Sequence, residues 1–379
     1  MELSKDILQY LEDSIEETHT LLETICRIPA PSHHEEKRAE FCKKWLEEQG
    51  AEGVYIDSAL NVIYPVNCEN RDDIVVFMAH TDVVFPDTEP LPFAKDDEYF
   101  YSPGVGDDTV CLTMMLMVIK YIIKNDIKPN RGILFVANAC EEGLGNLKGI
   151  RQIMQDFTGR IKEVYTFDGG YKHIVDVCVG SHRYQVKVTT EGGHSYNAFG
   201  NKNAIHYLSQ LVCGLYNQKL PDTPNNKTTF NVGGISGGTS VNTIAQEATM
   251  LYEYRSDLAA NLEFMKASFE KEVEKIRAMG VEVTVEVLGI RPCSGEVDWD
   301  VHEKMAQKAI AIQQKHSGYE CSRDSGSTDA NMPMSLGVPS ICVGTYEGSG
   351  AHTREEKVLI KSIPIGLKIT AELILDYFN

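Results

Sequence analysis

Short apolar runs and stretches of helical periodicity alternate over the first 180 residues of the chain. Apolar residues first recur at helical spacing over residues 7–28 and 37–49, which the breaker-rich segment IPAPSHH separates. The pattern then alternates in the order run 73–80, helix 110–124, run 132–142, helix 147–156 and run 164–170. Continuous apolar strands that alternate with helices are typical of a largely parallel sheet covered by helices on both faces. The sequence therefore predicts an α/β fold.

The order of the predicted elements changes at residue 181. The patterns that follow predict a strand, a helix, two strands, a helix and a strand, with the helices at 203–218 and 262–279. A βαββαβ order is typical of a ferredoxin-like α+β unit. We therefore predict that residues 181–290 form an inserted second domain.

The α/β pattern resumes after this insertion. It continues with a helix at 298–315, an apolar run at 338–346 and a final helix at 363–378. Residues 1–180 and 291–379 are thus predicted to form one domain. The length of 379 residues agrees with two domains, because a domain has about 150 residues on average.

Composition and charge indicate a folded, water-soluble protein. Hydrophobic residues make up 42% and charged residues 24% of the chain, which are ordinary values for globular proteins. The 55 acidic residues outnumber the 36 basic ones, and a net charge of −19 repels nucleic acid and anionic lipid alike. The longest apolar segment, residues 114–123, contains Lys120 and is well short of the ~20 residues that span a bilayer. We therefore expect neither a nucleic-acid partner nor a membrane location.

The cysteines point to a reducing compartment. The ten Cys residues are scattered singly, without a CxxC pair, and several stand inside apolar runs. The first residues, MELSKDILQYLEDSIEETH, form a charged amphipathic pattern without the apolar stretch of a signal peptide. These features predict a cytoplasmic location.

Four of the predicted sheet strands are followed by a histidine or a carboxylate. In open α/β sheets, ligands bind outside the carboxyl ends of the strands, so these side chains are expected to lie close together. They are His80 and Asp82, Glu141 and Glu142, Asp168, and His352. We predict that they form one site.

The donor types in this site predict a divalent metal. Imidazole and carboxylate ligands without thiolate suit Zn, Mn or Co. His80 and Asp82 are two residues apart, so on an extended strand their side chains point to the same face. Asp82 would then accept a hydrogen bond from the second ring nitrogen of His80 and fix its tautomer.

A second carboxylate pair extends the set to two metals. Asp107 and Asp108 lie between the glycine-rich GVG and a predicted helix. A bridging carboxylate, further carboxylates and two histidines are the ligand set of a two-metal hydrolase. Two divalent ions would be balanced by Asp107, Glu142, Asp168 and a bridging hydroxide, which leaves Glu141 free to carry a proton.

Each of these motifs, taken singly, also has an ordinary structural interpretation. An isolated HxD is typical of a hydrogen-bonded core histidine near a turn, and two Asp before a helix are typical of an N-terminal cap. Adjacent Glu residues are common on solvated surfaces, and the Asp of FDGG could be a turn former. The metal interpretation depends on the convergence of all of them.

The same motifs resemble one enzyme family over nearly the whole chain. They are, in chain order, MAHTDVV, GVGDDT, ACEEGLGN, TFDGG, GGHSYNAFGNKNA, SVNTIA, EYRSD, GSTDANM and GSGAHTREE. Their order is similar to that in the di-zinc exopeptidases and amidohydrolases, which include peptidase T, glutamate carboxypeptidase, aminoacylase, acetylornithine deacetylase and succinyl-diaminopimelate desuccinylase. The resemblance implies a zinc-exopeptidase-like catalytic domain, with the inserted ferredoxin-like domain acting as lid and dimerisation domain.

The resemblance also assigns the metal ligands. It implies that one zinc is held by His80 and Asp168 and the other by Glu142 and His352, with Asp107 as the bridge. It further implies a cis peptide bond between Asp107 and Asp108.

The resemblance assigns two further roles next to the metals. Asp82 would orient His80. Glu141 would be the general base that takes a proton from the metal-bridging water and later gives it to the leaving amine.

Three residues of the inserted domain match positions that contact substrate in the family. His194 matches a histidine that reaches the active site of the partner subunit and stabilises the oxyanion, which implies a homodimer. Arg255 matches an arginine that binds a substrate carboxylate, and Asn242 is expected to assist substrate binding. The ordinary alternatives are a polar turn residue for His194 and a cross-strand ion pair for Arg255.

Two positions depart from the pattern of many relatives. Thr109 stands where relatives often have Lys, which changes the charge around the metals, and position 168 is Asp rather than Glu. Together with FDGG and GSTDAN, Asp168 favours the peptidase T-like branch.

These observations predict a zinc-dependent exopeptidase, with Co or Mn as other possible metals, that acts on short peptides as a di- or tripeptidase or an aminopeptidase. An N-acyl-amino-acid amidohydrolase on the same scaffold is the alternative, because it would use the same catalytic residues with another substrate pocket. A catalytically silent binding protein is disfavoured by the complete ligand set and Glu141. A nicotinamide oxidoreductase is disfavoured because the glycine-rich loop lacks the third Gly of GxGxxG.

Overall fold

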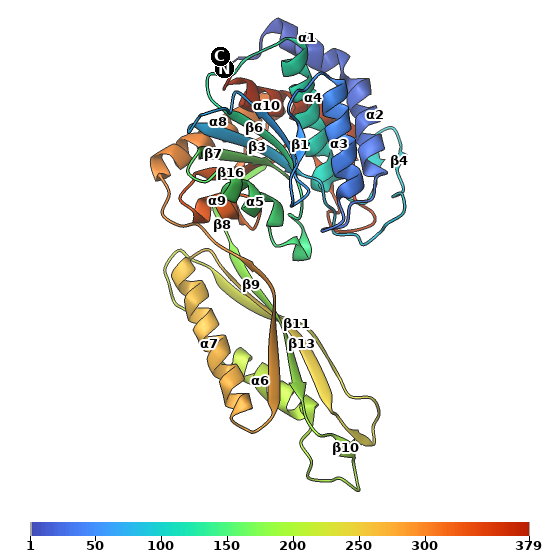
Figure 1. Cartoon of the computed structure of the whole chain (residues 1–379), viewed down its shortest axis with the longest axis vertical. Coiled ribbons are helices and arrows are strands. Elements are labelled where there is room, and N and C mark those ends of the chain that lie inside the picture. Colours follow the sequence, from blue (N-terminus) through green and yellow to red (C-terminus); the bar gives the residue numbers. More distant parts are fainter. Residues whose placement is uncertain (1, 379) are drawn as a thin grey trace. The chain divides into compact units, whose positions relative to one another are not determined.

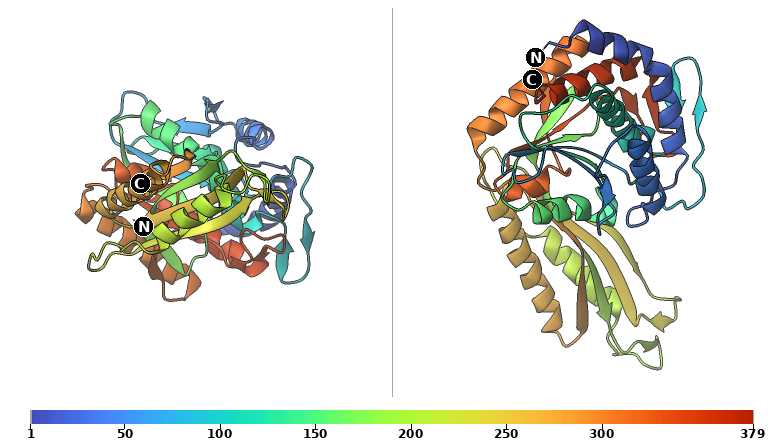
Figure 2. Two further views of the ribbon diagram at one scale, coloured as in Figure 1. Left: turned by 90° about the horizontal axis from the view of Figure 1, so that it is seen from below. Right: turned by 45° about the horizontal axis from the view of Figure 1, so that its top comes forward.

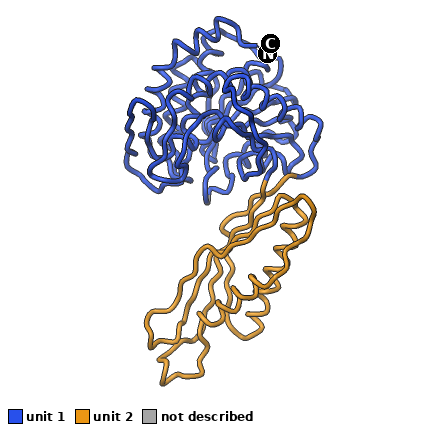
Figure 3. Tube along the Cα trace, turned by 180° about the vertical axis from the view of Figure 1, so that it is seen from behind, with its two compact units in different colours: residues 1–178, 295–379 blue, residues 179–294 orange. Residues whose placement is uncertain are grey.

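The computed structural model describes residues 2–378, which divide into two compact units. Unit 1 comprises residues 1–178 and 295–379, and unit 2 comprises residues 179–294, shown in two colours in Figure 3. None of the helices among the described residues combines the length and the apolar character that crossing a bilayer requires.

Unit 1 is built on an eight-stranded mixed sheet with the strand order β1-β2-β6-β3-β7-β16-β8-β15 (Figure 1). The strands are β1 (Tyr55–Ile56), β2 (Val62–Val66), β3 (Ile74–His80), β6 (Ile133–Asn138), β7 (Ile161–Phe167), β8 (His173–Cys178), β15 (Ser322–Gly326) and β16 (Ser340–Val343). The central strands β6, β3, β7 and β16 are parallel to one another. Antiparallel pairings occur only toward the two edges of this sheet as described, between β1 and β2, β2 and β6, and β8 and β16. The predicted α/β fold is confirmed, and its parallel part is the centre of the sheet.

Helices cover both faces of this sheet, as Figures 1 and 2 show. They are α1 (Lys5–Asp13), α2 (Ile15–Cys26), α3 (Glu36–Glu48), α4 (Cys111–Lys124), α5 (Lys148–Asp156), α8 (Trp299–Ser317), α9 (Asn331–Ser335) and α10 (Ile363–Leu375), with the 3-10 turns η2 (Gly143–Gly145) and η3 (Ile360–Ser362). On one face α4 packs against α10 and α2, and on the other α5 packs against α9.

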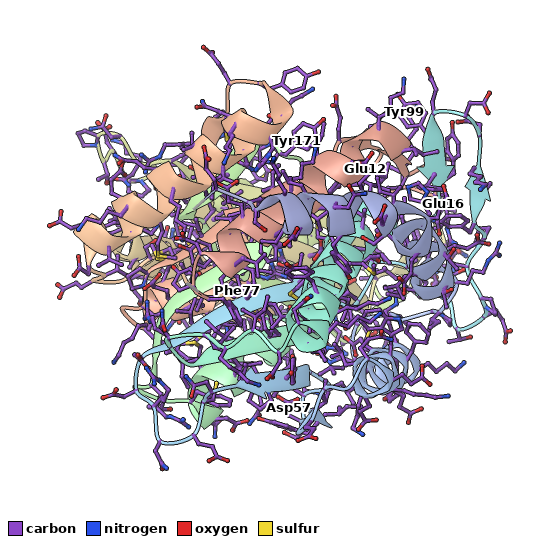
Figure 4. All side chains as sticks on the ribbon, turned by 90° about the horizontal axis from the view of Figure 1, so that it is seen from above. Glu12, Glu16, Asp57, Phe77, Tyr99 and Tyr171 are labelled. Carbon is purple, nitrogen blue, oxygen red and sulfur yellow. The ribbon has the colours of Figure 1, made fainter. Side chains whose placement is uncertain are left out.

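Strand β3 shows why the sheet is covered twice. All seven of its residues are buried, and successive side chains point to opposite faces. Val75 and Phe77 belong to the core on the α4 and α10 face, whereas Val76 and Met78 belong to the core that includes α5. Phe77, labelled in Figure 4, stacks on Tyr165 of β7 with ring centroids 5.3 Å apart. The continuous apolar pattern of the strand therefore follows from burial on both sides.

A small second sheet in unit 1 has the order β17-β18-β5-β4. Its strands are β4 (Ala94–Lys95), β5 (Tyr99–Tyr101), β17 (Gly348–Ser349) and β18 (Lys357–Leu359). The loop between β17 and β18 carries His352, and the segment after β5 leads into η1 (Val105–Val110) and α4. The sheet thus joins two of the segments that carry predicted metal ligands.

The two helices and the long strands of unit 2 follow the order that the sequence predicts, and two short strands that it does not predict are added. It contains β9 (Gly180–Thr189), β10 (Gly193–His194), α6 (Ala204–Tyr216), β11 (Thr228–Gly237), β12 (Thr243–Ile244), β13 (Glu247–Ser256), α7 (Ala259–Arg277) and β14 (Glu282–Arg291). The main sheet has the antiparallel order β11-β13-β9-β14, which is the ferredoxin-like arrangement. Alternate residues such as Val186 and Met250 are buried with Leu208 of α6 and Phe269 of α7, so both helices lie on one face of the sheet.

Candidate metal centre

The parallel strands bring four predicted site residues to one edge of the sheet. His80 is the last residue of β3 and lies opposite Asn138, the last residue of β6. Glu141 and Glu142 follow β6, and Asp168 directly follows β7. Because these strands are parallel and adjacent, their carboxyl ends meet at the same edge.

Two groups of metal-binding side chains share Asp107. The first group is His80, Asp107 and Asp168, and the second is Asp107, Glu142 and His352; within each group the ligand atoms lie within 4.8 Å of one another. The Nε2 atom of His80 is 3.0 Å from Oδ1 of Asp107. The Nε2 atom of His352 is 3.0 Å from Oδ2 of Asp107 and 3.3 Å from Oε2 of Glu142. Asp107 therefore presents one carboxylate oxygen to each group, which is the geometry of a bridging ligand.

The donor set fits two divalent cations. Imidazole nitrogens and carboxylate oxygens without a thiolate are ligands that zinc, manganese and cobalt accept. Among the described residues the buried Oε1 atom of Glu142 has no hydrogen-bond partner, although a buried carboxylate oxygen normally has one. A cation in the second group would supply that partner.

The electrostatics of the cluster describe negative charge gathered in a buried place. Burial, with the nearby carboxylates of Asp107 and Asp108, holds the pKa of Asp168 well above its usual value. Burial likewise raises the pKa of Glu142 to about 7. Hydrogen bonds to Asp107 and Glu142 raise the pKa of His352 to about 10. These shifts are those of ligands that hold protons until a cation displaces them.

Asp82 supports both the histidine and the glutamate pair. Its carboxylate oxygens accept the backbone N–H groups of Glu141 at 2.9 Å and Glu142 at 3.0 Å, and the hydroxyl of Ser32 at 2.6 Å. The Nδ1 atom of His80 lies 3.0 Å from the carbonyl oxygen of Asp82 and 3.4 Å from its carboxylate. Asp82 thus fixes the position of the segment that carries the predicted base as well as facing the ring of His80.

Comparison with known proteins identifies the family of this chain. The model of peptidase family M20/M25/M40 matches residues 76–376. The chain belongs to this family. The predicted family and the predicted enzyme class, a metallo-hydrolase of peptide or amide bonds, are thereby confirmed.

Relatives and solved structures of this family resemble the chain along its whole length. Succinyl-diaminopimelate desuccinylase from Corynebacterium glutamicum is 23% identical, over 94% of this chain and 94% of that protein. The aminopeptidase PepT structure from Bacillus cereus covers 96% of this chain and 99% of its own, with a TM-score of 0.72 and 21% identity. A tripeptidase structure from Staphylococcus aureus covers 95% and 97%, with a TM-score of 0.74 and 22% identity. A further structural neighbour, YXEP from Bacillus subtilis, is described as a dinuclear metal-binding peptidase.

The sequence motifs did not reveal the part that Glu356 plays in this M20-family site. Its carboxylate is buried and accepts three backbone N–H groups of the loop that carries the bridging residue: Gly104 and Gly106 at 2.7 Å and Asp107 at 2.8 Å. A Cβ at Gly106 would lie 2.6 Å from the hydroxyl oxygen of Tyr346, so a glycine is needed there. Glu356 lies four residues after His352. Nothing in the sequence distinguishes it from the exposed Glu355 that precedes it.

The peptide bond between Asp107 and Asp108 is cis, as the family resemblance implies. The side chains of the two residues diverge: Asp107 faces the two imidazoles, and Oδ2 of Asp108 accepts the backbone N–H of His80 at 2.9 Å. The two carboxylates therefore have different partners, and neither is a simple helix cap.

Asp329 is a second buried carboxylate to which the motifs assigned no role. It lies in GSTDANM, is 3% exposed, and accepts a hydrogen bond from the side-chain amide of Asn138 at 2.5 Å. Burial, with the nearby charge of Glu141, raises the pKa of Asp329 to about 8. Asp329 therefore stands beside the predicted base as a carboxylic acid that holds its proton near neutral pH.

The three predicted substrate residues lie in unit 2. His194 of β10 pairs with Thr243 of β12, and the backbone N–H of Ser195 donates to the carbonyl of Asn242 at 2.9 Å, so His194 and Asn242 belong to one loop region. The Nδ1 atom of His194 accepts from the backbone of Tyr196 at 3.3 Å, which is a turn contact.

Arg255 lies on β13, on the sheet face that α6 and α7 leave open. Its Nε and Nη2 atoms each donate to the carboxylate of Glu253 at 3.1 Å. Arg183 of the neighbouring strand β9 lies opposite Glu253, and its Nε is 3.5 Å from the same carboxylate. The ion pair of Arg255 is thus with a residue of its own strand, whereas the cross-strand pair at this place joins Arg183 to Glu253, and the fork of the Arg255 guanidinium holds a carboxylate.

Proposed function

We propose that this M20-family hydrolase is a two-metal exopeptidase that cleaves short peptides, as a di- or tripeptidase or an aminopeptidase. The observation that carries the proposal is the placement of Asp107, whose two oxygens lie 3.0 Å from His80 and 3.0 Å from His352. A ligand set built around a shared carboxylate would place two imidazoles at opposite oxygens of one side chain in this way.

His80 and Asp168 would hold one ion, Glu142 and His352 the other, and Asp107 both. Zinc is the proposed metal, with cobalt or manganese as substitutes that the same donors accept. When bound, two such ions lower the pKa of a water held between them and polarise a substrate carbonyl.

Glu141 is the proposed general base and acid. Its backbone is fixed by Asp82, it is buried, and it directly precedes the ligand Glu142. Its carboxylate would take a proton from the attacking water and pass it to the nitrogen of the leaving group. Asp82 would keep His80 in the tautomer that leaves Nε2 free to ligate.

Arg255 and His194 would recognise the substrate. The Arg255 guanidinium already holds the carboxylate of Glu253, and a substrate carboxylate suits the same fork. His194 would stabilise the oxyanion of the site in a partner subunit, and Asn242, in the same loop region, would assist binding.

A homodimer is part of the proposal because unit 2 exposes apolar side chains. Tyr196 is 85% exposed and Phe199 is 90% exposed in the loop that carries His194, and Ile205, Ile235 and Val241 are also exposed. Exposed aromatic and aliphatic residues of this kind are typical of interaction surfaces. A cytoplasmic location is supported by the cysteines, none of which forms a disulfide within the described chain.

An N-acyl-amino-acid amidohydrolase is the alternative, and the similarity to a desuccinylase favours it. A hydrolysis screen distinguishes the two. Purified protein with two zinc equivalents is incubated with tripeptides, dipeptides and N-acetylated or N-succinylated amino acids. Cleavage of the peptides is expected, and activity confined to the acylated compounds would overturn the peptidase proposal in favour of the amidohydrolase. Metal content per subunit, measured on the same sample, tests the two-ion site.

A further inference from the structure

Arg38 is a buried cation that the proposed mechanism does not use. It lies in the first turn of α3, is 0% exposed, and is among the largest side chains buried in the described chain. Burying a charge is costly unless hydrogen bonds and nearby opposite charge compensate it. A guanidinium in this position therefore needs a physical reason.

The hydrogen bonds of Arg38 all go to uncharged oxygens among the described residues. Nε and Nη2 donate to the carbonyl oxygen of Ile28 at 3.2 and 2.7 Å. Nη1 donates to the carbonyl oxygen of Thr81 at 2.7 Å and to the hydroxyl oxygen of Thr109 at 3.3 Å. A buried arginine would ordinarily pair with a carboxylate. The guanidinium of Arg38 instead donates to two backbone carbonyl oxygens and one hydroxyl oxygen.

The two threonines belong to the two segments that bring the metal ligands together. Thr81 lies between His80 and Asp82 at the end of β3, and Thr109 follows the bridging Asp107 by two residues in η1. One nitrogen of Arg38 thus reaches both segments, and the rest of the guanidinium is anchored to the chain just before α3. Its position fixes the separation of the two segments from a third element.

The charge of Arg38 acts in the same place. Buried Asp82 and Glu35 are the carboxylates whose charge acts on the guanidinium, and both hold backbone groups of the segment 140–142.

We propose that Arg38 is a positioning residue of the metal centre, which holds the segments of His80 and Asp107 at the separation that lets both side chains bind the same ion. The inference rests on the two-metal site of the proposed function. Arg38 touches neither ligand atoms nor substrate, so it acts on metal affinity and turnover through Thr81 and Thr109. If Arg38 only filled the core, its substitution would lower the stability of the protein and leave metal affinity and turnover unchanged.

The test compares Arg38→Lys and Arg38→Met with wild type in the full-length protein. Lysine keeps the charge but cannot reach the three oxygens with a rigid fork, and methionine also removes the charge. Three quantities are measured: the thermal midpoint of metal-stripped protein, the Zn²⁺ dissociation constants by chelator competition, and kcat and KM at saturating zinc. Arg27→Lys is the matched control, because Arg27 is an exposed arginine paired with Glu23.

Folded Arg38→Lys is expected to bind zinc about tenfold more weakly and to lose kcat to a similar degree, the effect common for residues behind metal ligands. Its KM is expected to stay within about twofold of wild type, Arg38→Met is expected to lose more, and Arg27→Lys to match wild type. Wild-type zinc dissociation constants and kcat in folded Arg38→Lys would overturn the proposal.

Thr109→Val provides a second test that does not disturb the buried charge, should Arg38→Met fail to fold. Valine has nearly the shape of threonine but no hydroxyl, so the contact with Nη1 is removed together with the contact of the same hydroxyl with the thiol of Cys26. Zinc binding is expected to weaken severalfold, and adding Thr109→Val to Arg38→Lys is expected to cost less than in wild type, because both changes break one contact. Unchanged zinc binding in Thr109→Val together with strict additivity would also overturn the proposal. If the wild-type protein bound no zinc, the two-metal function and this inference would both fail. If the wild-type protein bound zinc and the variants bound it equally well, only this inference would fail.

Discussion

The carboxylate of Glu356 accepts the backbone N–H of Asp107 at 2.8 Å, from a segment 249 residues away in the chain. The same carboxylate holds Gly104 and Gly106, so one side chain fixes the loop that presents Asp107, the proposed bridging ligand. Glu356 itself is four residues after His352. The loop that carries Asp107 is therefore held by the segment that carries His352.

Glu356→Gln is expected to weaken zinc binding by about ten- to a hundredfold, because an amide can accept from one side only and turns its NH₂ toward backbone donors. Chelator competition with metal-stripped protein measures the effect. Glu355→Gln, an exposed neighbour, is the control for the change of charge. Equal zinc affinities for the two variants would show that the loop keeps its shape without Glu356.

Glu141→Gln is expected to bind both metals and lose activity by about a hundred- to ten-thousandfold, because the amide keeps the shape of the side chain but cannot accept and return a proton. Metal content and kcat on the same preparation check this. A variant that turns over at the wild-type rate would remove Glu141 from the mechanism, whereas loss of metal would assign it to the ligands instead.

Metal binding is expected to release protons. The pKa of His352 is about 10 and that of His80 lies well above its usual value, because hydrogen bonds to carboxylates outweigh burial for His80 and dominate for His352. The imidazole of His352 therefore carries a proton at pH 8 in the metal-free protein, and a ligating imidazole must be neutral. Zinc affinity should accordingly rise with pH between about 6 and 9.

Calorimetry in buffers of different ionisation enthalpy measures these protons. At pH 8 we expect at least about one proton released per subunit, and fewer for His352→Ala. Proton-neutral binding with an affinity independent of pH would contradict the arrangement of the two imidazoles around Asp107.

Much of the catalytic unit could be predicted from the sequence because its central strands are buried on both faces. The apolar runs of β3 and β7 are continuous for that reason, and the residues that follow them must meet at one edge. The edge strands lack this signal. β15 has the sequence SRDSG and is almost wholly exposed, and β1 has two residues, so their pairing is set by the sheet rather than by their own pattern.

The support around the metal centre was less predictable than the ligands. The predicted ligands can be recognised in the sequence because they are histidines and carboxylates at strand ends. Glu356 and Arg38 cannot, because they bind backbone groups far away in the chain. From the sequence, Thr109 in place of Lys indicates a change of charge near the metals. In the structure, the guanidinium of Arg38 donates a hydrogen bond to the hydroxyl of Thr109. A single sequence cannot show such a contact because it depends on where the fold places the side chain of Arg38.

The proposed role of His194 in the site of a partner subunit makes the sharpest prediction. His194→Ala and Glu141→Gln each remove one part of the proposed site, so each homodimer is expected to be nearly inactive. In a mixed dimer, the subunit with an intact Glu141 would receive His194 from its Glu141→Gln partner, and one complete site would form. Random mixing makes half of the dimers mixed, with one complete site in two, so about one quarter of the wild-type activity should return. The measurement is activity after unfolding and refolding the two variants together, with each variant refolded alone as control. If His194 acted within its own subunit, no mixed dimer would contain a complete site and the activity would stay at the level of the controls.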